Sequence, residues 1–279
     1  MTTPIQVLIS LHKGYGLGDA VQMSSVLRHV VAARPNWVID YRAEEGKHQV
    51  GQGIVRSTFA YDDTYPSEHY DAEVQICLYD TWYGYKDRPN TRVSSCLKGL
   101  FDLNWKPELA QYQVNVSEFT KRWAVDTVPS DTVAIHYQGV TSKNKKDLTH
   151  EQAGRVCEDI RDFGCVPYDM GKVPMGYNAE VNCAIIQQCR AFVGIDSGPS
   201  KCASATDTPS LVVWTGHHPA PFHDPAPNTT HLVPVGYHGM VPVNNDPDVV
   251  KWFEEHYNIR QYEGDLVYEV EKWLQETLT

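Results

Sequence analysis

Short apolar runs alternate along this chain with stretches whose apolar residues recur at helical spacing. The first run covers residues 5–11 and predicts a buried strand. A glycine-rich turn follows, and the next helix has apolar residues at Val21, Val26, Leu27, Val30 and Val31. Up to residue 123 the pattern predicts further strands at 37–41, 73–79 and 111–116, and helices at 91–103 and 117–123. Strands that alternate with helices in this way are typical of the α/β class.

A second series of strands and helices begins after the polar segment 126–130, which we interpret as a linker. Strands are predicted at 132–137, 165–169, 191–195, 210–214 and 231–235. Helices are predicted at 149–163, 179–188 and 265–278, and another begins at Asp246. A chain of 279 residues is long enough for two domains of about 125 to 150 residues each. We therefore expect one α/β domain over residues 1–126 and another over 130–279.

The strand at 191–195 leads directly into the start of a helix. Ser197 is a favoured N-cap residue, and Pro199 suits the first helical position. The free N–H groups and the positive end of the helix dipole at such a start favour a phosphate group. Asp196 stands at the carboxyl end of the strand, where ligands bind in open α/β sheets. The main candidate ligand segment is therefore Asp196, Ser197, Gly198, Pro199, Ser200 and Lys201.

The first strand also ends in a turn, which carries glycines at Gly14, Gly16 and Gly18. Their spacing differs from the dinucleotide-binding pattern GxGxxG, because the third glycine comes one residue early. The turn is therefore either a weak nucleotide-binding motif or a simple connection between strand and helix. Asp19 follows Gly18, and its structural role would be to cap the helix.

A basic run follows the strand that ends at His136. It contains Lys143, Lys145 and Lys146, with the hydroxyl groups of Thr141 and Ser142 beside it. Lysines at the carboxyl end of a strand can neutralise a phosphate group, and a solvated surface loop is the alternative. His136 is either a buried histidine at a strand end or a catalytic group.

Two further groups of side chains are candidates for ligand contact. His217, His218, His223 and Asp224 lie in one proline-rich loop, but their spacing fits no fixed metal scaffold, so we prefer a loop beside a bound ligand. The aromatic residues Tyr79, Trp82, Tyr83 and Tyr85 gather in one segment. They form either interior packing or a surface on which a sugar or base stacks.

Composition limits the class of protein and its location. Apolar residues make up 42% of the chain, which is enough for packed cores. A net charge of −11 argues against a generally basic, nucleic-acid-binding surface. The seven cysteines form no CxxC pair, so a zinc ribbon is not expected. Because no secretory signal and no apolar run of membrane-spanning length occur, we expect a cytoplasmic protein with no integral membrane segment.

The segment from Phe192 to Lys201, with Ala203, Ala205, Thr208-Pro209 and the turn from Gly216 to Pro219, resembles the signature of heptosyltransferase-like glycosyltransferases. These are inverting, metal-independent enzymes of GT-B architecture, in which two Rossmann-like domains enclose a cleft. The resemblance implies an acceptor domain over 1–126 and a donor domain over 130–279. It also implies that the last helix, about 265–279, packs back on the first domain. Lys201 stands where the family has a histidine, which leaves the donor sugar open.

The same resemblance implies roles for single residues. Asp19 falls at the position of the family's catalytic base, beside Gly16 and Gly18. The family's phosphate-binding lysine lies in the loop after the 132–137 strand, where Lys146 fits best and Lys143 and Lys145 are rivals. His217 would lie near the donor. The donor substrate would be a nucleotide-diphosphate sugar, with no separate cofactor and no metal.

The acceptor stays open at this point, as a glycan, a lipid-linked saccharide or a modified DNA base. A phage-type enzyme that glycosylates hydroxymethylated DNA bases would keep the donor half and change the acceptor half. A basic groove would favour it, built from Lys13, Lys47, Arg88, Arg92 and the run 143–146. The alternative from another class is a non-catalytic protein that binds nucleotide sugars, and turnover of the donor would separate it from the enzymes.

Overall fold

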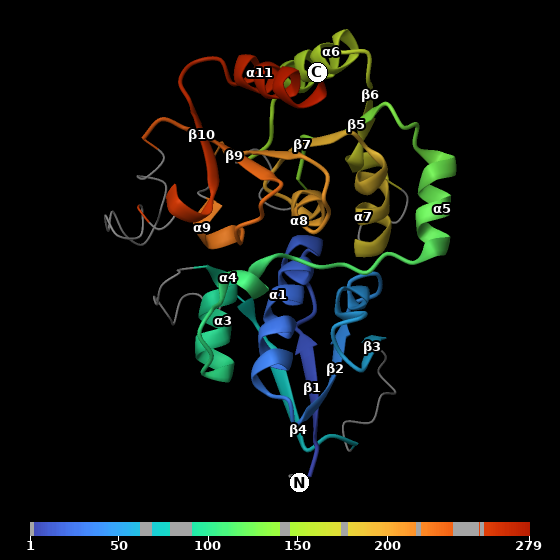
Figure 1. Cartoon of the computed structure of the whole chain (residues 1–279), viewed down its shortest axis with the longest axis vertical. Coiled ribbons are helices and arrows are strands. Elements are labelled where there is room, and N and C mark those ends of the chain that lie inside the picture. The colour runs from blue at the N-terminus through green and yellow to red at the C-terminus, as the bar shows by residue number, and fades with distance from the viewer. Residues whose placement is uncertain are drawn as a thin grey trace.

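The computed structural model describes residues 3–61, 69–78, 91–139, 146–173, 178–215, 219–236, 251 and 254–279. Their strands form two separate sheets, one in each half of the chain, which lie one below the other in Figure 1. The N-terminal sheet has the order β3-β2-β1-β4, and its pairings are all parallel. Its strands are β1 (Ile5–Leu11), β2 (Trp37–Ala43), β3 (Ser57–Ala60) and β4 (Ala72–Ile76).

The C-terminal sheet has the order β10-β9-β8-β7-β5-β6, and its pairings are also parallel. Its strands are β5 (Thr132–His136), β6 (Val166–Asp169), β7 (Ala191–Ile195), β8 (Ser210–Val213), β9 (Thr229–Pro234) and β10 (Asn258–Tyr262). All five residues of β7 are buried, as expected of a central strand in a parallel sheet covered by helices. The α/β class predicted from the sequence is confirmed.

Most of the described helices begin at a Ser, Thr, Asn or Asp residue whose side chain caps the first turn. At α6, Thr149 and Gln152 form a capping box, because Gln152 N donates to Thr149 Oγ1 at 3.1 Å and Thr149 N donates to Gln152 Oε1 at 2.9 Å. The helices are α1 (Leu17–Ala33), α3 (Arg92–Phe101), α4 (Pro107–Ala110), α5 (Glu118–Thr127), α6 (His150–Asp162), α7 (Ala179–Gln188), α8 (Gly198–Ser204), α9 (Pro219–Phe222) and α11 (Leu266–Leu278), with short 3-10 turns at His48–Gly51 and Met170–Lys172.

One apolar cluster, the shared core, spans both halves of the chain. The cluster that contains Val7 and Leu27 of the N-terminal half continues into Cys183 and Ala203 of the C-terminal half. In Figure 1 the start of α1 points at α8, and α7 lies beside α8 on the same side of the C-terminal sheet. The segment 126–130, predicted as a linker, covers the end of α5 and part of the connection to β5.

The last helix does not lie where the sequence resemblance predicted it. α11 packs on the C-terminal sheet beside α6, where Val270 and Leu274 are completely buried against Val133 and Ile160 (Figure 1). Three residues, 263–265, connect β10 to α11. A connection of that length spans at most about 10 Å, and β10 is the edge strand, so the helix stays on its own sheet instead of returning to the first half.

The predicted strand at 111–116 was also wrong. This segment pairs with none of the described strands and connects α4 to α5, with Tyr112, Val114 and Val116 buried in the shared core. An extended segment whose alternate side chains are buried shows the same sequence pattern as a strand, even when its backbone pairs with no other strand. The helix expected from Asp246 and the aromatic residues 79–85 lie outside the described residues.

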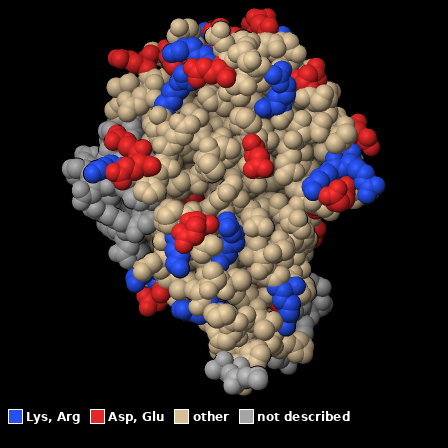
Figure 2. All heavy atoms as spheres, viewed as in Figure 1, with Lys and Arg blue, Asp and Glu red and all other residues tan. Residues whose placement is uncertain are grey.

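Surface features add little to the functional picture. On the face shown in Figure 2, basic and acidic side chains of the described residues are interspersed and not gathered by sign. None of the helices within the described ranges has the length and apolar character needed to cross a membrane. The seven cysteines are free thiols.

Candidate active site

The predicted ligand segment lies where the C-terminal sheet meets the first turn of α1. β5 and β7 pair in parallel with His136 opposite Gly194, so His136 and Asp196 lie at the same edge of the sheet. The start of α1 reaches this edge from the other half of the chain. A Cβ atom added to Gly18 would lie 3.5 Å from the Cα of Gly198 and 3.5 Å from the Cδ of Lys201. The structure therefore brings the two motifs of the sequence together.

Asp196 is shared by two lysines. Lys201 Nζ donates to Asp196 Oδ1, and Lys146 Nζ lies 3.8 Å from Asp196 Oδ2. The side chains of Lys201, Lys146 and Asp196 are only 6%, 13% and 9% exposed. Lys201 Nζ also lies 5.8 Å from the centre of the Trp214 ring. Two cations facing one carboxylate leave the cluster with an excess of one positive charge.

The charged groups of this cluster shift one another's pKa values. Burial alone would raise the pKa of Asp196, but the cations of Lys201 and Lys146 outweigh burial and lower that pKa to about 2. Burial also lowers the pKa of Lys201, and the Lys146 and Arg92 cations lower it further against the opposing effect of Asp196. An incoming anion would relieve this crowding of cations and would therefore bind favourably.

The start of α8 offers fewer free N–H groups than the sequence suggested. Capping by Ser197 is confirmed, because Ser200 N donates to Ser197 Oγ at 3.4 Å and Ser197 N donates to Ser200 Oγ at 3.0 Å. Pro199 has no N–H group. Gly198 lies against α1 so closely that a Cβ atom there would be 2.7 Å from the Cβ of Leu17. Attraction of an anion therefore falls mainly to the two lysines.

Asp19 lies at the third position of α1, and both of its carboxylate oxygens are engaged. Oδ2 accepts a hydrogen bond from Gly16 N at 3.0 Å, so Asp19 holds the backbone of the N-cap residue Gly16 and is not itself the N-cap that the sequence suggested. Oδ1 accepts from Arg92 Nη1 at 2.8 Å. The Asp19 side chain keeps 14% of its surface exposed. The sequence suggested Arg92 only as part of a basic groove, and no local signal could pair two residues that are 73 positions apart.

His136 is a neutral, buried neighbour of the cluster. It is 8% exposed, and burial lowers its pKa to about 4, aided by the Lys146 cation and opposed by Asp169 and Asp147. Within the described part of the chain, its Nδ1 has no hydrogen-bond partner. The other candidates, Thr141, Ser142, Lys143 and His217, lie outside the described residues together with Lys145 and His218.

His223 and Asp224 belong to the packing between the halves instead of a ligand-facing loop. His223 is completely buried, its Nε2 lies 3.2 Å from Ser204 Oγ, and burial lowers its pKa to about 3. Asp224 is 1% exposed, and its backbone N–H donates to the hydroxyl of Tyr112 at 2.7 Å. Over the ranges that the structure describes, no three His, Cys, Asp or Glu side chains are grouped so that they could hold a metal ion.

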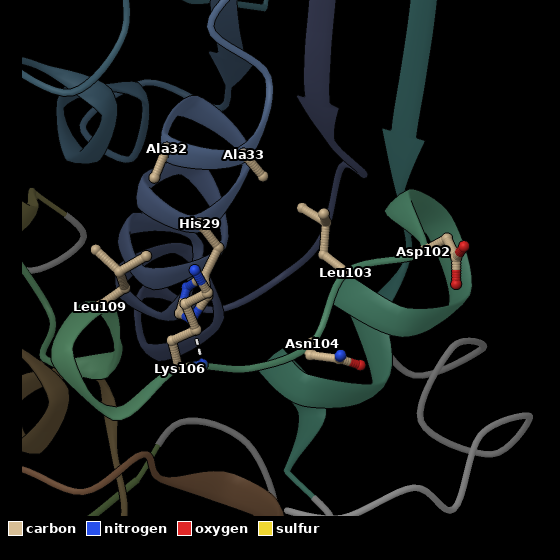
Figure 3. A pocket seen from close by; sticks show the side chains of 8 residues that line it. All are labelled: His29, Ala32, Ala33, Asp102, Leu103, Asn104, Lys106 and Leu109. Atoms are coloured by element: carbon tan, nitrogen blue, oxygen red, sulfur yellow. Dashed lines mark hydrogen bonds between the residues drawn. The ribbon is translucent and has the colours of Figure 1, made fainter.

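One cavity among the described residues lies away from this cluster, at the C-terminal end of α1. It has a volume of about 240 Å³ and is lined by His29, Ala32, Ala33, Asp102, Leu103, Asn104, Lys106 and Leu109 (Figure 3). Both ring nitrogens of His29 are engaged, Nδ1 with Ser25 O at 2.7 Å and Nε2 with Lys106 N at 2.9 Å. None of the candidate residues lines this cavity, and its one histidine is a structural residue.

Comparison with known proteins shows similarity in structure but no match in sequence. No protein-family model and no curated protein matches the sequence. A glycosyl transferase family 9 protein from Veillonella parvula is similar in structure, with a TM-score of 0.66 and 13% identity over 100% of this chain and 98% of that one. The E. coli ADP-heptose LPS heptosyltransferase II gives a TM-score of 0.66 and 12% identity over 98% of both chains.

A third similar structure is an E. coli heptosyltransferase solved with ADP, with a TM-score of 0.56 and 14% identity over 90% of this chain and 100% of that one. These structural similarities extend over nearly the whole chain and so cover both sheets. At 12–14% sequence identity they show a shared fold. The chain therefore has the GT-B architecture of these glycosyltransferases, as its sequence resemblance implied.

Proposed function

We propose that this chain is a glycosyltransferase that moves a sugar from a nucleotide-diphosphate sugar to a hydroxyl acceptor. The observation that carries the proposal is the approach of the Gly18-Asp19 turn, from one half of the chain, to Gly198 and Lys201 of the charged cluster, from the other. A carboxylate beside an excess positive charge suits a reaction that removes a proton and expels an anion. The fold shared with an E. coli heptosyltransferase solved with ADP supports the same interpretation.

In the proposed reaction, Asp19 accepts the proton of the acceptor hydroxyl as its oxygen attacks the anomeric carbon of the donor. The bond from that carbon to the diphosphate breaks, and the configuration of the carbon inverts. Lys146 neutralises the departing diphosphate, because it is held to Asp196 only at 3.8 Å and is the more exposed of the two lysines. Lys201, which is in direct contact with Asp196, adds a second positive charge to the cluster that faces the diphosphate.

The acceptor is proposed to be a saccharide in preference to a DNA base. Three of the cations that would build a DNA groove are engaged within the protein. Lys47 Nζ donates to Glu44 Oε2 and to Tyr15 O, both at 2.6 Å. Lys13 Nζ lies over the ring of Tyr61, and Arg92 donates to Asp19. Arg88 lies outside the described residues.

Calorimetry with nucleoside diphosphates tests the donor half of the proposal. Lys146→Ala should weaken binding of ADP, UDP or GDP about ten-fold or more, because a charge-assisted contact contributes about 1.5–3 kcal/mol. Binding of the corresponding nucleoside should hardly change. Lys172→Ala is the matched control, since Lys172 is 82% exposed and lies 3.5 Å from Asp169. Equal, small losses in both variants would contradict a diphosphate site at Lys146.

A further inference from the structure

Arg92 is placed to control the carboxylate of Asp19. It is the first residue of α3, and its side chain is 7% exposed. Gly16 N holds Asp19 Oδ2 at 3.0 Å, and Arg92 Nη1 holds Oδ1 at 2.8 Å. The terminal torsion of an aspartate is soft, so one hydrogen bond alone would let the carboxylate pivot. Two donors from different elements fix its plane.

Arg92 is itself held by the other half of the chain. Its guanidinium carbon lies 4.4 Å from the centre of the Phe222 ring, at the end of α9. The backbone carbonyl of Phe222 accepts a hydrogen bond from Gln22 Nε2 of α1 at 3.1 Å. This bond also joins the two halves of the chain and holds Phe222 in place beside Arg92. A planar guanidinium stacks on an aromatic face and donates from its edge at the same time, which a lysine cannot reproduce.

We infer that Arg92 is a positioning residue for Asp19, and that Phe222 makes this positioning depend on contact between the two halves of the chain. The inference rests on the proposed function. Each oxygen of Asp19 accepts one hydrogen bond within the protein and keeps a second lone pair for the acceptor hydroxyl. With the halves apart, Arg92 loses the ring that holds it, and the carboxylate loses its fixed direction. The base is then ready only when donor and acceptor halves meet.

Steady-state kinetics on Arg92→Lys and Phe222→Leu test the inference. Each change should lower kcat about ten-fold while the KM for the donor stays within about two-fold, because small misplacement of a catalytic group costs up to about 10²-fold in rate. In the double variant the losses should not add, since both act through one contact. Lys98→Gln is the control on the same helix, where Lys98 pairs with the exposed Asp102. It should keep normal turnover.

A third variant separates positioning from a merely structural role. Arg92→Ala should lose turnover and regain about ten-fold of it when millimolar methylguanidinium is added, because the free cation can occupy the vacated place beside Asp19. Unchanged kcat in Arg92→Lys, fully additive losses with Phe222→Leu, or no rescue of Arg92→Ala would overturn the inference. If the unaltered protein transfers no sugar from any donor, the proposed function fails first. Normal transfer combined with any of these three results refutes the role of Arg92 alone.

Discussion

Replacing Asp224 by asparagine should change how the stability of the fold depends on pH. Asp224 is 1% exposed, and neither of its carboxylate oxygens has a hydrogen-bond partner among the described residues. Burial raises its pKa from the ordinary value of 3.8 to about 7, although the nearby hydroxyls of Thr91 and Ser25 and the Lys201 cation oppose the rise. The fold therefore holds this carboxyl in its neutral form at mildly acidic pH.

The sign follows from the raised pKa of the folded state. The stability that Asp224 contributes is fully present below pH 3.8 and is lost as pH rises through about 7. A shift of this size corresponds to about 4 kcal/mol in total, at about 1.4 kcal/mol for each pH unit. Asparagine does not titrate, so its free energy of unfolding relative to the unaltered protein should climb by that amount between about pH 4 and about pH 8. The lowered pKa of His223 gives an opposite slope, which cancels because both proteins keep that residue.

Urea unfolding followed by tryptophan fluorescence measures this difference across the pH range. At low pH the variant should be slightly less stable, because a buried amide without partners costs about 1–3 kcal/mol. At high pH it should be the more stable protein. Asp131→Asn, at an exposed carboxylate, is the control for removing one negative charge. Parallel stability curves for the Asp224 variant and the unaltered protein would refute the account of a buried, neutral carboxyl.

Two further changes test the contact around α8. Gly198→Ala should destabilise the fold by about 1–3 kcal/mol, because its Cβ atom would lie 2.7 Å from the Cβ of Leu17. A smaller residue at position 17 should recover part of this loss in thermal unfolding. Unchanged stability of Gly198→Ala would mean that α1 and α8 do not touch there. Lys201→Met should cost about 3–5 kcal/mol at neutral pH, because it leaves Asp196 buried with Lys146 alone at 3.8 Å; unchanged urea unfolding would contradict the buried ion pair.

The sequence predicted those parts of the structure that depend on local patterns. The strand β7, the cap at Ser197 and the existence of α1 after the first glycine-rich turn follow from apolar periodicity and from capping chemistry. The resemblance then implied the GT-B fold, which the structure and its similar proteins confirm.

Features that depend on distant partners were not predictable in this way. The pairing of Arg92 with Asp19 joins residues 73 positions apart, and the contact of Phe222 with Arg92 crosses between the halves. The side on which α11 packs was decided by the short connection from an edge strand that the sequence pattern did not reveal. Residues 111–116 alternate like a strand because the core covers one side of them, and only the structure shows that they pair with none of the described strands.

Turnover by Asp19→Asn tests the central claim most directly. A panel of nucleotide-diphosphate sugars, each offered with an oligosaccharide, a lipid-linked saccharide and hydroxymethylated DNA, first identifies the pair that the unaltered protein joins. With that pair, Asp19→Asn should bind nucleoside diphosphate normally and transfer sugar about 10²-fold or more slowly, the scale for loss of a general base. Near-normal transfer by Asp19→Asn would leave Asp19 only a structural role at the start of α1 and would contradict the account.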